Sequence, residues 1–405
     1  MHTPAEATEP SSSARVARAG YWLYAGHLLS LFSIAASSIL LGLTILSLPW
    51  TARRRPALNW QSLAPLTIPL AAYVLLLVGA IFASYDPRMS VGSLRELFTL
   101  AALPLGPLLV RGERDVRRLV DALLAVATLL ACAGLAQYLF GYGGIDRRIR
   151  GPFSHYMTFS GFLLIADLLL VASMLCAGRW RSPWRWLALA AINVALLGSL
   201  TRGAWVALGL TLTALLLVRA PRWLLAWIPA ALLLTILAPV PILHRVLSIT
   251  DLRDTSNYDR LCMLDAGLAM IAERPLFGLG PDLVKRRYPI YRDPTAPRYH
   301  VPHLHNSLLQ LAAERGLPAL ASYLALTGAA FWIAWRRYRS EGREGPRADL
   351  YLGVMLALLA FNLAGLFENN WGDTEVQRAL LFVLAIPFCL TANPAAVSVP
   401  GPPDG

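Results

Sequence analysis

Charged residues are scarce in this sequence, and lysine is almost absent. Only 15% of the 405 residues are charged, 56% are hydrophobic, and the mean hydropathy is +0.52. Soluble globular domains carry about 25% charged residues, so the composition excludes that class and predicts a membrane protein. Lys285 is the only lysine in a chain of net charge +12, and the arginines stand in short clusters between apolar runs. A nucleic-acid-binding protein gathers its basic residues along one face, so we expect no nucleic-acid partner.

Cysteines are also few, and common metal motifs are missing. Three of the four cysteines lie inside apolar segments and Cys262 stands alone in a long polar segment. Neither a disulfide framework nor a cysteine metal site has the ligands that it needs, and no HExxH pattern is present. We therefore expect no metal and no other cofactor.

The N-terminus lacks the pattern of a cleavable signal peptide. Residues 1–19 are polar, and the apolar stretch 21–50 is about twice as long as a signal core. We expect this segment to be retained, with residues 1–20 as a cytoplasmic tail.

Long apolar runs fill most of the remaining chain. A bilayer span needs about 20 apolar residues, or fewer where neighbours bury a short helix. The sequence predicts an all-α polytopic membrane protein of about twelve membrane helices, nine of them in 21–240 and three in 318–392, with one large helical loop at 241–317 between spans 9 and 10. The expected spans are two short helices in 21–50, then 60–84, 90–110, 116–140, 156–177, 184–199, 203–218, 222–240, 318–335, 350–367 and 377–392.

Arginine clusters orient these helices, because basic residues concentrate in short cytoplasmic loops. With a cytoplasmic N-terminus, alternate loops each carry a cluster, so 393–405 is a second cytoplasmic tail and 241–317 lies outside. The clusters predicted to be cytoplasmic are Arg15 and Arg18; Arg53, Arg54 and Arg55; Arg111, Arg114, Arg117 and Arg118; Arg179, Arg181 and Arg185; Arg219 and Arg222; and Arg336, Arg337, Arg339, Arg343 and Arg347.

Several arginines lie outside against this rule, which indicates an anionic ligand there. A guanidinium binds phosphate oxygens in a bidentate fork and stays charged, so pyrophosphate suits it. The bland alternatives are that Arg202 snorkels to the membrane surface and that Arg260 is a solvated surface residue. The candidate phosphate ligands are Arg202, Arg260 and the cluster of Arg147, Arg148 and Arg150, of which we expect at least one to bind.

The large loop is predicted to contain two helices. The run SNYDRLCMLDAGLAMIAERP reads as an amphipathic helix capped by Ser256 or Asn257. The following stretch, 276–301, is expected to be irregular. A second helix is predicted to open at Pro302 and to end at Gly316.

His303, His305 and Asn306 fall at the start of this second helix. Histidine can take a proton from a sugar hydroxyl near neutral pH. A helix would place His305 about 16 Å from Gly316, just above the membrane. Residues two apart on a helix point about 200° from each other, so His303 and His305 would not converge with His300 on zinc unless the segment is irregular. The alternative is a pair of loop histidines satisfied by water. Structural roles are expected for the carboxylates Asp251, Asp254, Asp259 and Glu314.

The segment VPHLHNSLLQLAAERGLPAL resembles the His-Asn signature of the O-antigen ligase and polymerase superfamily, with His305 at the place of the signature histidine. SLTRGAW around Arg202, SNYDRLCMLDAGLAMIAERPLFGLGP around Arg260 and RGPFSHYMTFSGF around Arg150 resemble its other recurrent blocks, in the same order. The resemblance covers most of the chain and includes the twelve spans and the large outside loop.

This resemblance implies a GT-C-like fold and an O-antigen ligase in the bacterial inner membrane, with its site facing the periplasm. Such an enzyme moves a glycan from undecaprenyl pyrophosphate to lipid A-core by a metal-independent, inverting transfer. His305 would be the base, and Arg202 and Arg260 would bind the donor pyrophosphate with help from Arg150 and Arg147. His303 and Asn306 would be accessory.

Three alternatives stay open. An O-antigen polymerase tends to carry two substantial outside loops, and a protein O-oligosaccharyltransferase tends to be longer after the histidine block. A transporter or flippase of anionic lipids would show ionisable residues at mid-membrane and paired halves. Asp167 and Arg95 are the few candidates for such residues, and the sequence shows no internal repeat.

Overall fold

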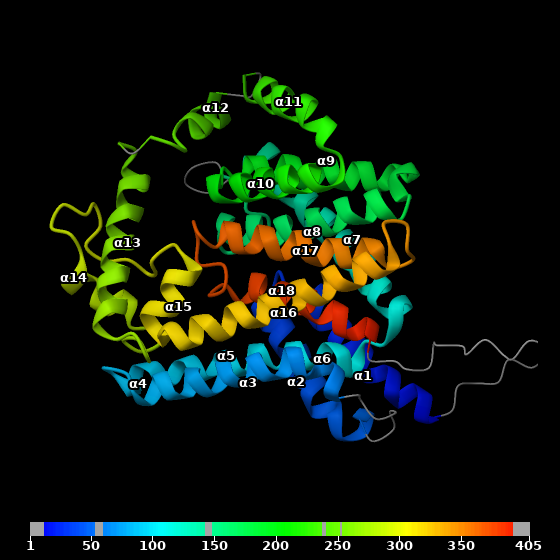
Figure 1. Ribbon diagram of the computed structural model, residues 1–405, viewed down its shortest axis with the longest axis horizontal. Coiled ribbons are helices and arrows are strands. Elements are labelled where there is room, and N and C mark those ends of the chain that lie inside the picture. Colours follow the sequence, from blue (N-terminus) through cyan, green and yellow to red (C-terminus); the bar gives the residue numbers. More distant parts are fainter. Residues whose placement is uncertain (1–11, 53–59, 142–147, 237–239, 252, 392–405) are drawn as a thin grey trace, which may run out of the picture.

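A computed structural model describes residues 12–52, 60–141, 148–236, 240–251 and 253–391 of the protein. The described residues form helices joined by turns and irregular segments, with no strand among them. Long helices lie side by side, and α13 stands across their ends (Figure 1). The all-α prediction is confirmed for this part of the chain.

The apolar runs form helices close to their predicted places. Their bounds are α1 (Ser12–Leu29), α2 (Ile34–Ala52), α3 (Trp60–Phe82), α7 (Gly112–Leu139), α8 (Tyr156–Cys176), α9 (Pro183–Gly198), α10 (Arg202–Arg219), α11 (Leu224–Ile236), α16 (Leu317–Glu341), α17 (Ala348–Ala364) and α18 (Thr374–Thr391). Short 3-10 turns, η2 (Arg179–Arg181) and η3 (Pro221–Trp223), precede α9 and α11.

Two predicted spans are divided. The stretch 90–110 falls into α4 (Pro87–Ser90), η1 (Val91–Leu94), α5 (Arg95–Leu100) and α6 (Ala102–Leu109). α5 ends at Leu100 because Pro104 has no N–H to donate to that carbonyl. The predicted span 222–240 is α11 alone, and a separate helix, α12 (Val240–Leu247), opens the large loop.

Six described helices are long and apolar enough to cross a bilayer, namely α2, α3, α7, α8, α10 and α16, and two shorter apolar helices are α9 and α17. Large apolar side chains such as Ile68 and Leu75 on α3 and Leu46 on α2 point outward and are exposed. Outward apolar surface is stable where lipid is the solvent. The count of twelve spans stays a prediction.

The centre of the molecule is built from α8, α17 and α18. α17 packs against both other helices, α7 packs against α9, and α16 packs against α3. Leu168, Val354 and Leu384, one from each central helix, are fully buried. Helices that are apolar all round belong in such an interior.

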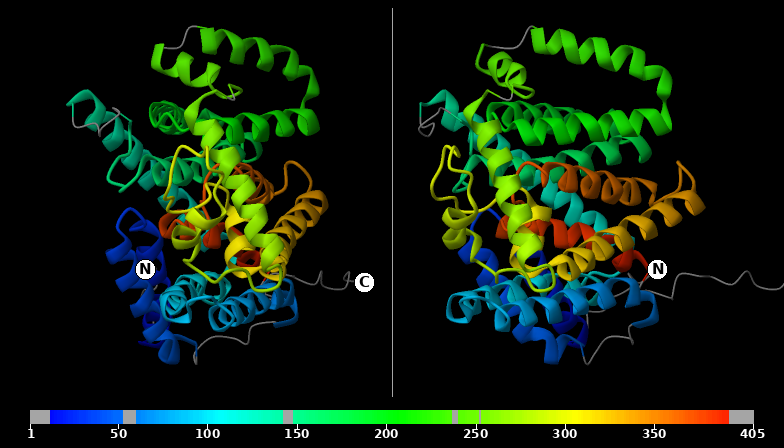
Figure 2. Two further views of the ribbon diagram at one scale, coloured as in Figure 1. Left: turned by 90° about the vertical axis from the view of Figure 1, so that its left-hand side faces the viewer. Right: turned by 60° about the vertical axis from the view of Figure 1, so that its left-hand side comes forward.

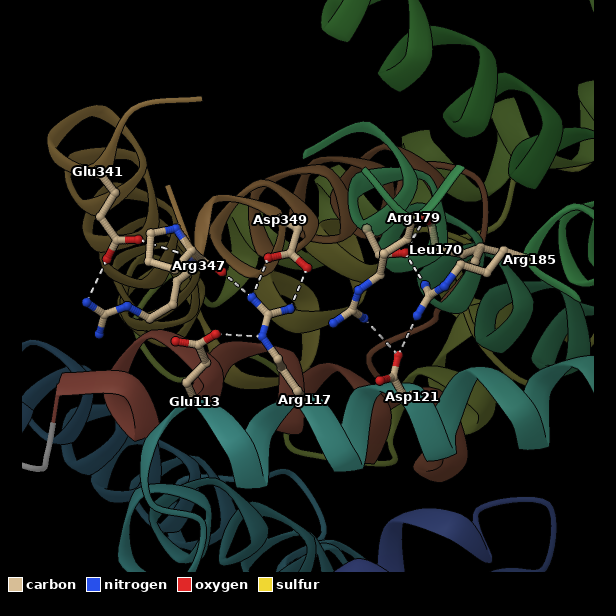
Figure 3. Close-up of polar contacts among 11 residues, drawn as sticks. Glu113, Arg117, Asp121, Leu170, Arg179, Arg185, Glu341, Arg347 and Asp349 are labelled. Atoms are coloured by element: carbon tan, nitrogen blue, oxygen red, sulfur yellow. Dashed lines mark hydrogen bonds and ion pairs between the residues drawn. The ribbon is translucent and has the colours of Figure 1, made fainter. Parts of the chain in front are cut away.

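Arginines at one end of the helices are tied to carboxylates (Figure 3). We call Arg117, Arg179, Arg185 and Arg347 the paired arginines. The bonded pairs are Arg117 with Glu113 (2.7 Å) and Asp349 (2.8 Å), Asp121 with Arg179 (3.2 Å) and Arg185 (2.7 Å), and Arg347 with Glu341 (2.9 Å). All four lie in loops or helix ends that the sequence predicts to be cytoplasmic.

The large loop holds more structure than its sequence predicts. α13 (Thr255–Glu273) is capped by Asp254, whose carboxylate accepts from the N–H groups of Ser256 and Asn257, so the predicted cap was two or three residues late. The prediction of an irregular 276–301 is wrong, because this stretch contains α14 (Val284–Tyr291). Val284 and Tyr288 are buried in a cluster with α13 side chains. This packing stabilises a helix that the local sequence pattern does not predict.

The second loop helix, α15 (Ser307–Arg315), begins five residues later than predicted. The carboxamide of Asn306 accepts from the N–H of Leu309 at 3.0 Å, and an Asn cap of this kind outcompetes a helix start at Pro302. Gly316 ends the helix at φ +84°, a conformation that favours glycine, as predicted. The two histidines therefore precede the helix.

Candidate functional site

His303 and His305 lie in an irregular segment and point toward each other. Their ring centroids are 4.3 Å apart, and His305 has φ +48°. The expectation that they diverge on a helix is wrong for this reason. A left-handed conformation is uncommon for a non-glycine residue and gathers at functional sites.

Glu368 joins the two histidines. Its Oε2 lies 2.9 Å from Nδ1 of His305, and its Oε1 lies 3.3 Å from Nε2 of His303. Burial alone raises the pKa of this carboxyl, but the hydrogen bond from His305, the attraction to either histidine when it is protonated, and the backbone N–H of Asn369 outweigh it, so the pKa is lowered and the group is ionised. Sequence reasoning missed Glu368. Its only signal is an acidic residue in the short connection between α17 and α18, which carries no basic residue.

Two sets of contacts hold Glu368 beside the histidines. Ser307 donates from its backbone N–H to Gly365 at 2.7 Å and from its hydroxyl to the Glu368 carbonyl at 3.1 Å. Trp371 is buried edge-on against Tyr73 and Tyr323 and donates to the Tyr73 hydroxyl at 3.0 Å. The start of α15 and the segment before α18 thus form one rigid frame.

This frame orients the His305 ring and selects the tautomer of its neutral form. Because ionised Glu368 can only accept, Nδ1 of His305 carries the proton in that bond, a tautomer assigned from the hydrogen-bond network. In the neutral form of this ring Nε2 is then an acceptor, and it is buried without a hydrogen-bond partner in the described part of the chain. Burial lowers the pKa of His303 to about 4, which keeps that ring neutral near pH 7.

The histidines open into a cavity of about 660 Å³, which we call the histidine cavity. Asp373 faces it and accepts from the hydroxyl of Thr158 at 3.0 Å. Burial, reinforced by the charge of Glu368, raises the pKa of Asp373 to about 7. The polar lining includes His155, His303, His305, Glu368, Asp373 and Arg298. Such a cavity is large enough for a sugar.

A second cavity, of about 210 Å³, adjoins the first, and we call it the arginine cavity. Tyr156, Ser256, Arg260 and Glu368 line both cavities. Its charged lining is dominated by four arginines from four separate segments, Arg148, Arg202, Arg245 and Arg260, which we call the cavity arginines.

Arg202 is the most firmly held of these. It begins α10, is 7% exposed, and donates to the Ser248 carbonyl at 2.9 Å and to Asp254 at 3.1 Å. Gly203 brings α10 against the segment before α18, because a Cβ there would lie 2.7 Å from the Cβ of Phe367. The guanidinium is thus enclosed by protein at the end of a membrane-length helix.

The guanidinium groups of Arg260 and Arg245 differ from that of Arg202 in having no hydrogen bond or ion pair within the residues that the structure describes. Burial lowers the pKa of Arg260, while the charge of Glu368 partly opposes that shift. The guanidinium of Arg148 lies 4.3 Å above the centre of the Tyr156 ring. A half-buried guanidinium without a counter-charge is costly unless an anion binds. The arginine cavity therefore suits a polyphosphate.

The other predicted residues lie elsewhere. Arg150 is exposed, donates to the Ser154 carbonyl at 3.1 Å and lines neither cavity. Arg147 lies outside the described residues. Asn306 uses its side-chain oxygen as the cap of α15. Arg245 was missed, because nothing in the sequence separates it from the other arginines of the loop.

One chemical alternative is visible in the same cluster. Ligand atoms of His303, His305 and Glu368 all lie within 4.8 Å of one another. Two imidazole nitrogens and one carboxylate oxygen form a donor set that zinc accepts. The expected absence of a metal therefore stays a prediction, and a chelator can test it.

A model of the family described as O-Antigen ligase matches residues 186–324, from α9 into α16. The matched segment includes Arg202, Arg245, Arg260 and both central histidines, whereas Glu368 lies beyond it. No curated protein matches the chain. Residues 186–324 therefore carry a domain of the O-antigen ligase superfamily, and the membrane-length helices support a multi-pass membrane protein.

Proposed function

We propose that this protein is an O-antigen ligase of the bacterial inner membrane. It transfers a glycan from undecaprenyl pyrophosphate to a hydroxyl of lipid A-core, on the periplasmic side. The large loop 241–317 and the segment before α18 would form the catalytic face. The family match supports the superfamily, and the choice of donor and acceptor is the proposal.

One observation carries this proposal. His305 lines the histidine cavity, its ring is held by Glu368, its buried Nε2 has no hydrogen-bond partner among the described residues, and the cavity adjoins the one with four arginines. A base and a polyphosphate site side by side are what a glycosyl transfer from a lipid pyrophosphate needs.

In the proposed reaction, the acceptor hydroxyl oxygen attacks the anomeric carbon from the side opposite the pyrophosphate. The new carbon–oxygen bond forms as the bond to pyrophosphate breaks, so the anomeric configuration inverts. Nε2 of His305 takes the hydroxyl proton, and the polyprenyl pyrophosphate leaves with the bonding electrons. Glu368 is a positioning residue that stabilises the imidazolium as it forms.

Arg202 and Arg260 would hold the departing pyrophosphate, with Arg148 and Arg245 joining them. Charge that develops on a leaving group is stabilised best by donors fixed in advance, and each donor typically contributes several kcal/mol, about 3. The hydrogen bonds of Arg202 to Ser248 and Asp254 fix the position of its guanidinium group before the donor binds. Arg150 has no such place in the cavity, so we leave it out of the donor site.

The experiment is a transfer assay with purified protein in lipid nanodiscs and a synthetic polyprenyl-pyrophosphate glycan as donor. Lipid A-core, a second donor glycan and an acceptor protein are offered separately. Transfer to lipid A-core alone is the expected result. Growth of the donor glycan would make the protein a polymerase, transfer to protein would make it a protein ligase, and donor movement without any new bond would make it a transporter.

Glu368→Gln tests the proposed base in the same assay, with exposed Glu344→Gln as the matched control. The glutamine amide can donate as well as accept, so it should no longer hold the His305 proton on Nδ1. Turnover should fall, at most by the factor of about 10² to 10⁴ that a general base contributes. Glu344→Gln should retain wild-type turnover. A chelator is added in parallel. If chelation abolishes transfer and zinc restores it, the cluster is a metal site and the base mechanism is wrong.

A further inference from the structure

A third cavity lies far from the site described above. It has a volume of about 390 Å³ and is formed where the ends of α3, α16 and α18 meet. Its lining consists of Ser62, Ile333, Arg336, Arg337, Ser340 and Phe388. The cavity therefore combines two guanidinium groups with an apolar wall.

The cavity sits at the opposite end of α16 from the catalytic face. α16 begins at Leu317, directly after α15, and Arg336 is 19 residues further along. At about 1.5 Å per residue the two ends are roughly 29 Å apart, close to the thickness of a bilayer's hydrocarbon core. Trp332 lies about one turn before Arg336 and Trp335 directly precedes it, and tryptophan gathers at the membrane–water interface. Arg336 and Arg337 thus lie at the level of lipid headgroups.

These two arginines differ from the paired arginines near the same end of the bundle. Each paired arginine contacts a carboxylate within 3.2 Å. Arg336 and Arg337 are exposed and have neither an ion pair nor a side-chain hydrogen bond in the part of the chain that the structure describes. The orientation of the chain in the membrane depends only on positive charge at this end of the helices. It does not explain why the two arginines line a cavity between three helices.

We propose that this cavity binds the headgroup of an anionic phospholipid. The forked guanidinium groups would bind the phosphodiester oxygens, and Ile333 and Phe388 would contact the start of the acyl chains. Basic cavities between membrane helices on the cytoplasmic side suit such lipids. A free phosphate ion shares the anionic chemistry but would leave the apolar wall unused. The inference is independent of the transfer reaction.

The experiment measures lipid retention and thermal stability on the whole purified protein in detergent. Phosphatidylglycerol is titrated, with phosphatidylcholine and inorganic phosphate as separate arms. The test variant is Arg336→Gln with Arg337→Gln. Its matched control is Arg339→Gln with Arg343→Gln, which removes the same charge from the same end of the bundle without lining the cavity. A third variant, Arg336→Lys with Arg337→Lys, keeps the charge for membrane insertion but loses the bidentate guanidinium geometry.

Phosphatidylglycerol should stabilise the wild type and the control variant, and phosphatidylcholine should not. The glutamine variant should lose most of the stabilisation by phosphatidylglycerol. The lysine variant should be stabilised less than the wild type, with an affinity for phosphatidylglycerol that is at least several-fold lower. Equal losses in the glutamine variant and its control would mean diffuse attraction to the surface and would overturn the site. An equal response to inorganic phosphate would also overturn the proposal, since it would make this a free-anion site.

Discussion

Two groups of arginines in this protein have the same chemistry and opposite surroundings. The paired arginines at one end of the helices each meet a carboxylate (Figure 3). Among the cavity arginines, Arg202 has Asp254 as a partner, while Arg245 and Arg260 have no partner within the described residues. Figure 2 shows α13, which carries Arg260, crossing the ends of the long helices.

The difference teaches how to separate structural from functional arginines. A buried or half-buried charge costs free energy unless an opposite charge or several hydrogen bonds compensate it. The paired arginines are compensated by this chain, so they need no further ligand. The cavity arginines carry an excess of positive charge that an anionic substrate can compensate. Exposure and residue type alone do not separate the two groups.

His305→Ala should produce the largest effect on the catalytic side of this comparison. It removes the unpartnered Nε2 and leaves the arginines in place, so turnover should fall by about 10² to 10⁴-fold while donor binding changes little. Transfer rate and donor affinity are measured together. His300→Ala is the matched control, because His300 is exposed and lines neither cavity. Wild-type turnover in His305→Ala would remove the base from the mechanism.

Arg117→Ala should have the opposite effect: it should lower the stability of the protein and leave its turnover unchanged. It leaves Asp349, whose side chain is 3% exposed, without its main partner, so the protein should lose roughly 3 kcal/mol of stability. The folded fraction should keep wild-type turnover, because this end of the molecule is remote from both catalytic cavities. Unfolding in a graded denaturant series measures the loss, with exposed Arg343→Ala as control. A variant that is stable but inactive would break the comparison.

The sequence predicted most of the fold because apolar runs and caps are local signals. The helices around 60–82 and 156–176, the start of α10 at Arg202 and the end of α15 at Gly316 all follow from such signals. Arg260 and His305 could be proposed for the same reason, since both lie in recognisable blocks.

The remaining part of the site depends on contacts between distant segments. Glu368 is 63 residues from His305, and no spacing rule links them. Arg245 of α12 lines the arginine cavity together with Arg202 of α10, which is 43 residues earlier, and no local signal links the two. His305 was placed on a helix because Pro302 signals a helix start. An Asn can also cap a helix, and sequence alone does not decide between Pro302 and Asn306. In the structure the helix begins after Asn306, whose side-chain oxygen accepts a hydrogen bond from the N–H of Leu309.

Arg260→Lys sharpens the comparison among the cavity arginines. Lysine keeps the charge but loses the bidentate fork, and a hydrogen bond to a charged group contributes about 1.5–3 kcal/mol. Transfer efficiency at low donor concentration should therefore fall by about 10- to 100-fold. Arg150→Lys should change it little, because Arg150 lines neither cavity. Equal losses in both variants would return Arg150 to the donor site.

Asp373→Asn tests whether ionisation of Asp373, a carboxyl that lines the histidine cavity, destabilises the folded protein. The pKa of Asp373 is raised to about 7, so the folded protein binds its proton more tightly than the unfolded chain, where the ordinary value is 3.8. The stability that this proton provides is complete below pH 3.8 and is lost as pH rises through about 7. Asparagine stays neutral and can still accept from Thr158.

The variant should therefore match the wild type near pH 4 and become the more stable protein between pH 4 and 7, with the gain constant above that window. Thermal unfolding at pH 4.5, 6 and 8 measures it, and exposed Asp265→Asn shows what a surface carboxylate contributes. We expect this to be the smallest of the four effects, because Asp373 is only half-buried and water screens its charge. A variant that is less stable than the wild type at pH 8 and approaches it at pH 4.5 would have the opposite sign, and would mean that Asp373 is ionised and compensated, like the carboxylates of the paired arginines.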